Sequence, residues 1–304
     1  MSVPVGTGNK GPLDRAAGGG AVMAARISNR DYAVVLGRAF GGALIFSMPM
    51  LMTMEMWWLG FSADRLRLAL FLLAVFPLLV GLSYFAGLRE TERWTDAVQD
   101  ALTAYAVGFL SSALFLWLFG VLAPEQTLAE MLGKVALQAV PASIGAVLSR
   151  TQLNLDGGPG DTRPGSAGPR TPRGDPYAIE LFFMTVGALF VAFNVAPTEE
   201  MLLIAFQMSS LQALALALVS LLLMHAFVYT LDFAGQESPP EHASLAGIFF
   251  RFTVVGYAIA LLVSLYVLWT FGRTDGLGPA EVMQTTVVLG FASAIGAATA
   301  RLIL

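Results

Sequence analysis

Eight long apolar runs dominate this 304-residue chain and restrict what it can fold into. Each run can cross the roughly 30 Å hydrocarbon core of a bilayer, which takes about 20 residues of α-helix. Only 12% of the residues are charged, against roughly 25% in soluble domains. These properties exclude a soluble globular enzyme and predict an all-α, polytopic transmembrane helix bundle. The runs cover residues 34–58, 66–87, 99–122, 128–149, 179–205, 210–232, 248–271 and 280–301.

Two segments without long apolar runs divide the chain. Residues 1–30 are rich in Gly, Ala and Pro, and we expect them to form a disordered tail. Residues 151–177 combine Gly, Pro and Arg, a composition typical of a flexible linker. The predicted organisation is therefore the tail, a first four-span unit over 31–150, the cytoplasmic linker, and a second four-span unit over 178–304.

Lysine and arginine gather on one side of the predicted spans. Positive charge near span ends tends to stay in the cytoplasm, so this bias predicts the orientation. The side with both termini and the linker carries eleven such residues, against three on the other side. We therefore expect a multi-pass protein of the bacterial inner membrane with both termini in the cytoplasm. The eleven are Lys10, Arg15, Arg26, Arg30, Arg89, Arg93, Arg150, Arg163, Arg170, Arg173 and Arg301, and the three are Arg65, Arg67 and Arg273.

The two four-span units resemble each other in sequence. An offset of 145 residues gives ten identities over residues 32–62, and offsets of 152 and 151 align the later spans. Shared apolar composition does not readily produce matched Thr, Glu and Gly, so we predict a duplicated unit. Each unit has an even number of spans, so both insert in the same sense and matched residues lie at equal depth. Matched pairs include Thr53 with Thr198, Glu55 with Glu200, Tyr84 with Tyr229, Phe119 with Phe271, and Gly145 with Gly296.

Paired carboxylates are the strongest candidates for a functional site. Glu55 and Glu200 lie toward the outer ends of the first and fifth predicted spans, and ionisable residues at such positions mark ion pathways. Each follows a threonine by two residues and a proline by a few, and Glu199 precedes Glu200. Carboxylate, hydroxyl and carbonyl oxygens suit hard cations, so Thr53 and Thr198 join the predicted ion-binding set. The alternative is that the glutamates reach water at the interface as structural residues.

Other polar residues have weaker functional readings. His225 lies inside the sixth predicted span with Tyr229 one turn later, and together with Tyr84 they form a candidate proton relay. A hydrogen-bonded histidine inside the bundle is the alternative. Glu130 and Glu281 stand three residues after Thr127 and Gly278, which is the spacing of carboxylates that cap helix starts.

The segment 196–200 resembles the first motif of the glutamate-dependent intramembrane proteases related to prenyl-protein endopeptidases, Glu-Glu-x-x-x-Arg. In this sequence Ile204 stands at the arginine position and Leu221 at the phenylalanine of the Phe-x-x-x-His motif. No second histidine within a predicted span accompanies His225. A general base needs orienting partners to act, so we rank proteolysis last and do not expect an enzyme.

The segments Gly37–Leu44, Thr53–Trp58 and Val195–Met201 resemble a family of bacterial integral membrane proteins with a domain of unknown function. The resemblance covers residues 31–304 and implies eight spans without implying an activity. We predict a cation or proton channel or transporter, and the alternative is a non-transporting scaffold or accessory subunit. The expected partners are the lipid bilayer and a small cation or proton, with self-association left open. No nucleic acid, cofactor or metal centre is expected, and the lack of cysteine excludes thiolate metal ligands.

Overall fold

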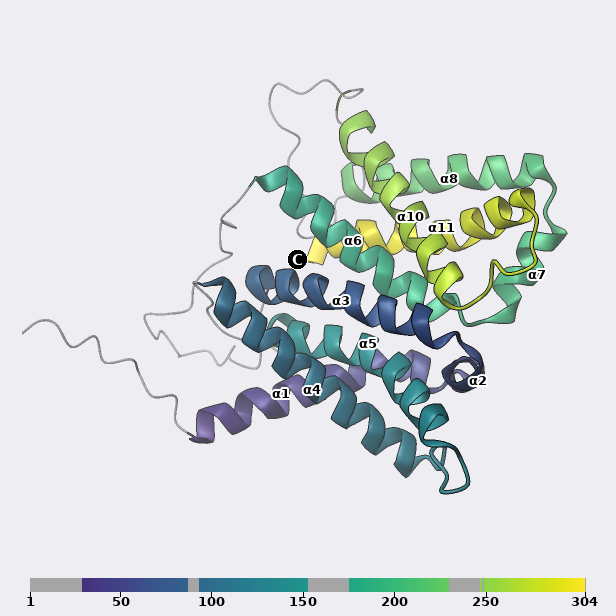
Figure 1. The fold of residues 1–304 in the computed structure, drawn as a ribbon. Coiled ribbons are helices and arrows are strands. Elements are labelled where there is room, and N and C mark those ends of the chain that lie inside the picture. The colour runs from purple at the N-terminus through teal and green to yellow at the C-terminus, as the bar shows by residue number, and fades with distance from the viewer. Residues whose placement is uncertain (1–28, 87–92, 153–174, 230–246, 248, 304) are drawn as a thin grey trace, which may run out of the picture.

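The structure, a computed structural model, describes residues 29–86, 93–152, 175–229, 247 and 249–303. Within these ranges all regular elements are helical, and eight helical segments are long and apolar enough to cross a membrane, as predicted. The long helices run roughly along one direction (Figure 1). The elements are α1 (Asn29–Leu51), α2 (Met54–Ser62), α3 (Arg65–Ala86), α4 (Trp94–Leu118), α5 (Leu128–Gln152), α6 (Pro176–Val195), α7 (Glu199–Gln207), α8 (Ser210–Tyr229), η2 (Phe249–Val254), α10 (Val255–Thr270) and α11 (Pro279–Ile303).

The predictions for the two polar segments fall mostly outside the described residues. Residues 1–28 of the expected tail and residues 153–174 of the expected linker lie outside the described residues. At the end of that linker, Asp175 caps α6 by accepting a hydrogen bond from the backbone N–H of Tyr177 at 3.1 Å. The second half of the bundle therefore begins with a capped helix.

The first and fifth spans end earlier than predicted, which corrects their boundaries. α1 ends at Leu51 and α6 at Val195, and each is followed by a separate nine-residue helix, α2 or α7. At the breaks, Thr53 and Thr198 have extended backbone, with ψ of 114° and 141°. Pro197 has no backbone N–H to donate to a carbonyl in the preceding turn, which favours a break there. Proline alone does not end a helix in this bundle, since Pro49, Pro77 and Pro141 lie inside α1, α3 and α5.

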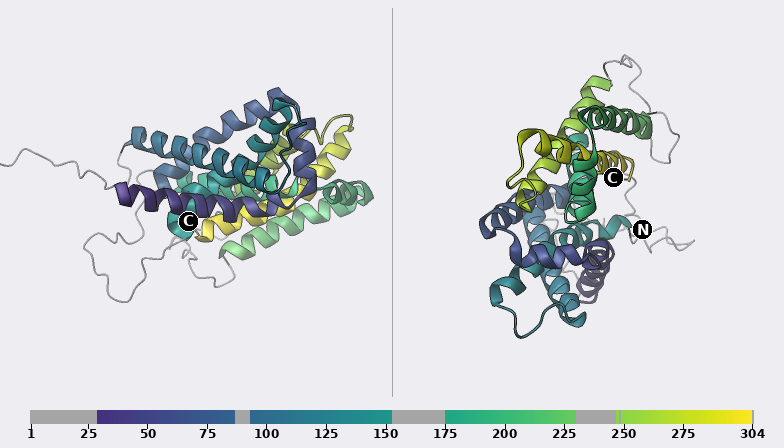
Figure 2. Two further views of the ribbon diagram at one scale, coloured as in Figure 1. Left: turned by 90° about the horizontal axis from the view of Figure 1, so that it is seen from below. Right: turned by 90° about the vertical axis from the view of Figure 1, so that its right-hand side faces the viewer.

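α5 and α11 lie at the centres of two helix groups. α5 is the most buried of the eight spans and packs against α1, α2, α3 and α4. Its small residues Ala139, Ala142 and Ala146 are fully buried, and small residues let membrane helices approach closely. α11 packs in the same way against α6, α7, α8 and α10. The purple-to-teal group α1–α5 and the green-to-yellow group α6–α11 lie side by side (Figures 1 and 2).

Two pairs of glycines make nearly identical close contacts. A Cβ added at Gly42 would lie 2.3 Å from the carbonyl oxygen of Gly145, where α1 crosses α5. A Cβ added at Gly187 would lie 2.2 Å from the carbonyl oxygen of Gly296, where α6 crosses α11. The two pairs are related by the offsets of 145 and 151 residues. A duplicated four-helix unit predicts such matched contacts.

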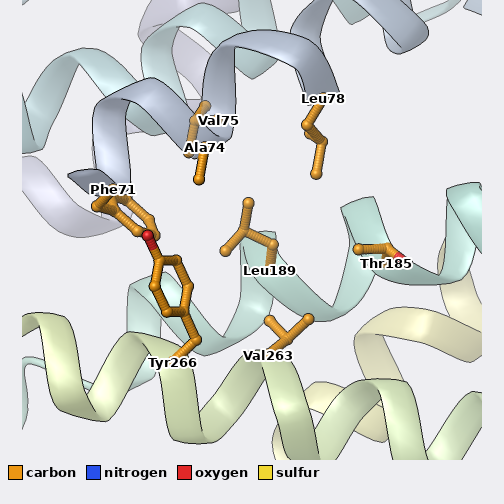
Figure 3. A pocket seen from close by; sticks show the side chains of 8 residues that line it. All are labelled: Phe71, Ala74, Val75, Leu78, Thr185, Leu189, Val263 and Tyr266. Carbon is orange, nitrogen blue, oxygen red and sulfur yellow. The ribbon is translucent and has the colours of Figure 1, made fainter.

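α3 joins the two groups through aromatic packing. Phe71 is fully buried, and its ring stacks on that of Phe193 in α6 with centroids 5.1 Å apart and planes 4° apart. Tyr266 of α10 lies 5.8 Å from the same ring, and Phe85 lies 5.4 Å from Phe182 of α6. A cavity of about 130 Å³ lies among α3, α6 and α10, with Phe71 and Tyr266 at one end (Figure 3). The packing of α3 on α6 and α10 around Phe71 is therefore aromatic and apolar.

The predicted caps of α5 and α11 are confirmed. The Glu130 carboxylate accepts a hydrogen bond from the backbone N–H of Thr127 at 3.1 Å, and the Glu281 carboxylate accepts one from Gly278 at 2.7 Å. The Thr127 hydroxyl also accepts a hydrogen bond from the backbone N–H of Glu130 at 3.3 Å, which completes a reciprocal capping box.

Removing either cap is expected to weaken the fold by a small and similar amount. Glu130→Ala and Glu281→Ala should each lower the free energy of unfolding by about 0.5–1 kcal/mol, the typical contribution of one hydrogen bond. Equilibrium unfolding in mixed micelles of rising SDS content measures the change in the free energy of unfolding. Glu125→Ala is the matched control, since Glu125 is an exposed carboxylate in the same α4–α5 connection. An equal loss in Glu125→Ala would show that the effect comes from charge rather than capping.

Candidate functional site

The predicted glutamates lie in the first turns of α2 and α7. Glu55 is the second residue of α2 and Glu200 is the second residue of α7, so the two occupy the same place in two nine-residue helices. Glu199 is the first residue of α7. Both short helices lie at one end of the bundle, called here the α2–α7 end (Figure 1). The structure thus places the three carboxylates beyond the ends of the long helices, rather than inside continuous spans.

The predicted threonines close the helix breaks. The Thr53 hydroxyl donates a hydrogen bond to the carbonyl oxygen of Pro49 at 2.8 Å, and the Thr198 hydroxyl donates one to Val195 at 2.8 Å. The Thr53 hydroxyl thereby satisfies a carbonyl just before the α1–α2 break. The Thr198 hydroxyl is a second donor to the Val195 carbonyl, which also accepts the backbone N–H of Thr198 at 3.1 Å. The hydroxyl oxygens keep their lone pairs, so they remain able to act as ligands of a cation.

The three carboxylates are open to solvent or headgroups at this end. Glu199 and Glu200 are exposed and Glu55 is half-buried. Among the residues that the structure describes, no hydrogen bond or ion pair joins these carboxylates to a donor. The N-terminus of a helix carries a partial positive charge, which stabilises acidic residues in the first turn. This position gives the glutamates a structural role as well as a candidate functional one.

The carboxylates do not form one cluster within the described chain. α2 packs on α5 whereas α7 packs on α11, so Glu55 and Glu200 belong to different helix groups. The described residues contain no group of three or more acidic, histidine or cysteine side chains that could hold a metal ion. Two cavities among the described residues are lined mainly by apolar side chains, with Thr185 and Tyr266 in one and Thr299 in the other. The larger, of about 220 Å³, lies where α1, α5, α6 and α11 meet.

Each short helix has a cationic side chain beside it, and the sequence did not predict either contact. A guanidinium N–H of Arg273, in the connection between α10 and α11, donates a hydrogen bond to the carbonyl of Pro197 at the α6–α7 break. Lys134 of α5 is buried against Gly60 of α2, and its ammonium donates to the carbonyl of Val121 at 3.1 Å. The Arg273 contact brings positive charge to the α6–α7 break, whereas Lys134 lies beside the later part of α2.

A third cation links the two helix groups at the same end. Arg67, near the start of α3, donates to the carboxylate of Asp275 at 2.9 Å and to the carbonyl of Trp269 at 3.0 Å. Its guanidinium also lies 5.0 Å from the centroid of the Trp269 ring, a cation–π distance. The two partners are 208 and 202 residues away in the sequence, so spacing alone could not reveal them.

The candidate relay residues have local partners. Nδ1 of His225 lies 2.9 Å from the Thr253 hydroxyl, and the histidine ring meets Phe249 edge-on. Tyr84 stacks on Trp94 with centroids 4.3 Å apart. Tyr229 is the last residue of α8, and its side chain lies outside the described residues. These contacts support the alternative in which His225 is a hydrogen-bonded histidine inside the bundle.

The sequence of the chain matches one known family over almost its whole length. The family model of the integral membrane proteins DUF2391 matches residues 35–304, which include nearly all of the eight spans, both helix breaks and all three carboxylates. No curated protein and no solved structure matches the chain. The match agrees with the eight membrane-spanning segments of the structure. The chain therefore belongs to the DUF2391 family of integral membrane proteins.

Proposed function

We propose that this membrane protein conducts a cation or proton, or couples its transport to one, and that Glu55 and Glu200 with Glu199 form an acidic entry at the α2–α7 end. Thr53 and Thr198 contribute hydroxyl oxygens to the same entry. We place this end on the outer face of a bacterial inner membrane, with both termini in the cytoplasm, because of the excess of lysine and arginine on the other side.

One observation carries the proposal. Carboxylates for which the described residues provide no donor stand at the same position of two short helices, at one end of the bundle. A broken helix beside an ionisable group is how membrane transport proteins present backbone and side-chain oxygens to ions. A set of carboxylates at a pore mouth attracts cations and repels anions.

Flux measurements in proteoliposomes test the proposal. With Na⁺, K⁺, Ca²⁺ and protons as the panel, the double variant Glu55→Gln/Glu200→Gln should reduce cation uptake several-fold at about 10 mM ionic strength, where the Debye length is about 30 Å. The loss should shrink at about 1 M salt, where the Debye length falls to about 3 Å. This salt dependence separates an electrostatic entry from a structural defect.

Glu125→Gln provides the matched control for this measurement. It removes one carboxylate from the α4–α5 connection at the same end, away from both helix breaks. Its flux should equal that of the unchanged protein. If the double variant conducts as well as the unchanged protein at low ionic strength, the assignment of Glu55 and Glu200 is wrong.

A non-transporting scaffold or accessory subunit is the second candidate. Two observations favour it: the first-turn position explains the carboxylates by helix stabilisation, and the described cavities are mainly apolar. This function predicts no flux across the ion panel. It also predicts a stable protein partner after gentle purification, with unchanged association in the double glutamine variant.

Proteolysis gains no support from the geometry. Glu199 begins α7 at one end of the bundle, whereas His225 lies fifteen residues beyond the start of α8. At 1.5 Å per residue the histidine is about 22 Å further along the bundle. One activated water cannot contact both groups. A proteolytic function predicts cleavage of a membrane substrate that Glu199→Ala abolishes, and we expect no such cleavage.

A further inference from the structure

α3 and α8 hold corresponding places in the two helix groups but are covered to different extents. α3 packs on α5, and α8 packs on α11. α3 has a second cover, because α6 and α10 of the other group pack against its opposite side. α3 also packs on α4 of its own group, and 39% of its apolar stretch is buried, against 17% for α8. In Figure 1 α8 lies on the far side of its group, away from α3.

The face of α6 that covers α3 has an uncovered counterpart on α1. Phe193 is 1% exposed beneath Phe71, whereas Met48, which stands 145 residues before Phe193, is 41% exposed. Pro197 is buried, whereas its counterpart Met52 is 62% exposed. The first group therefore has the same kind of face as the second, without a helix upon it.

α10 and its counterpart α4 differ in burial, as α6 and α1 do. Thr270 is fully buried and its counterpart Leu118, 152 residues earlier, is 56% exposed. Phe271 is 4% exposed and its counterpart Phe119 is 48% exposed. Phe119 and Phe271 end their helices with nearly the same backbone angles, φ of −83° and −85°, so they are equivalent positions. Phe271 packs on Phe193 of its own group, with ring centroids 5.1 Å apart, whereas Met48, the counterpart of Phe193 in the first group, is 41% exposed.

Exposure to lipid is normal for an apolar helix face and would not by itself indicate a partner. Here the chain shows which kind of helix covers such a face, because α3 lies on the equivalent face of α6 and α10. We propose that α8 of a second copy packs on the face formed by Met48, Met52, Leu118 and Phe119, called here the α1–α4 face. It packs there as α3 packs on α6 and α10 within one chain.

This contact joins two different surfaces, so it repeats from unit to unit until a ring closes. Each chain offers one uncovered α8 and one uncovered α1–α4 face. Two chains related by a two-fold axis use all four surfaces and leave none open. The product is a homodimer with four similar helix groups around one axis. The dimer follows from burial and packing alone, and it does not depend on cation transport.

The residues of α8 suit this position. Leu216 and Leu223 are half-buried and stand at the positions of Phe71 and Leu78, whose side chains face α6 and α10. Gln212 stands at the position of Arg67 and is exposed. Its amide can donate to a main-chain carbonyl of the second copy, as the Arg67 guanidinium donates to a carbonyl within the chain. The proposed surface is thus apolar with one polar group at its end.

Cysteine cross-linking in native membranes tests the proposal. The chain has no cysteine, so introduced pairs react without background. Met48→Cys with Leu216→Cys places thiols at the positions equivalent to Phe193 and Phe71. Copper phenanthroline or a short bis-methanethiosulfonate should shift most of this variant to a band at twice the 32.3 kDa of one chain. Mixing differently tagged chains that each carry one of the two cysteines should give a cross-link containing both tags.

Met48→Cys with Leu222→Cys is the matched control. Leu222 is six residues further along α8 on a lipid-exposed side, so this pair should remain at the monomer mass. Equal cross-linking of the control pair would mean random collision and would overturn the proposal. Cross-linking by Leu216→Cys alone would replace it with a symmetric contact between two α8 helices. A monomer mass in mild detergent, together with no cross-link in membranes, would exclude the dimer.

Discussion

Gly145→Ala and Gly296→Ala are each expected to lower the free energy of unfolding by about 2–3 kcal/mol, the range typical of overpacked interiors. The added Cβ would lie 2.3 Å from the carbonyl oxygen of Gly42 in the first case and 2.4 Å from that of Gly187 in the second. Both neighbours are backbone atoms of a packed helix, so the two helices must separate to admit a single methyl group.

Whether the two variants lose the same amount of stability is as informative as how much each one loses. Similar losses at Gly145 and Gly296 would agree with one unit used twice. Gly37→Ala is the control, because no atom lies within 4 Å of a Cβ at that position of α1. Alanine also favours helix over glycine, so this control should not destabilise the protein. Unfolding by SDS in mixed micelles gives all three values, and no loss in either close-contact variant would contradict the helix crossings.

Phe71→Ala is expected to cost about 3–4 kcal/mol, as removal of a buried phenylalanine usually does. The ring fills the space where α3 meets both Phe193 and Tyr266, and its loss would enlarge the adjoining cavity (Figure 3). Because these contacts join the two helix groups, the variant should also loosen one group from the other. Protease sensitivity at the connections between the groups would report that separation.

Two further variants identify the origin of this loss. Leu73→Ala changes a residue of α3 that is 69% exposed, and surface changes of this kind usually cost within about 0.5 kcal/mol. A double-mutant cycle of Phe71→Ala with Phe193→Ala should give a coupling energy of about 1 kcal/mol for the stacked rings. Additive effects of the two changes would mean that the stacking itself contributes nothing.

The number and kind of the spans could be predicted because apolar runs of this length have one stable solution in lipid. The ends of the first and fifth spans could not. Met54 and Trp57 in α2 continue the apolar pattern of α1, so hydropathy gives no sign of the break at Thr53. A threonine two residues before a glutamate is a helix-start pattern, and together with the nearby prolines it was the available signal.

The surroundings of the candidate site were less predictable. The sequence placed Glu55 and Glu200 at matched depth, and the structure puts them at matched positions of α2 and α7. Their cationic neighbours could not be foreseen, since Arg273 reaches the Pro197 carbonyl from 76 residues away. Such contacts depend on how the helix groups pack, and apolar helices in lipid carry little sequence information about their neighbours.

The central positions of α5 and α11 have a consequence for biosynthesis. These helices are the least apolar of the eight spans, and α5 buries Lys134 and Gln138. Lys134 lies in the second turn of α5, and a charged residue within a span makes entry of that helix alone into a membrane less favourable. Both helices are also the last of their group to leave the ribosome. Because the partner helices are synthesised first, their surfaces are available when each central helix enters the bilayer.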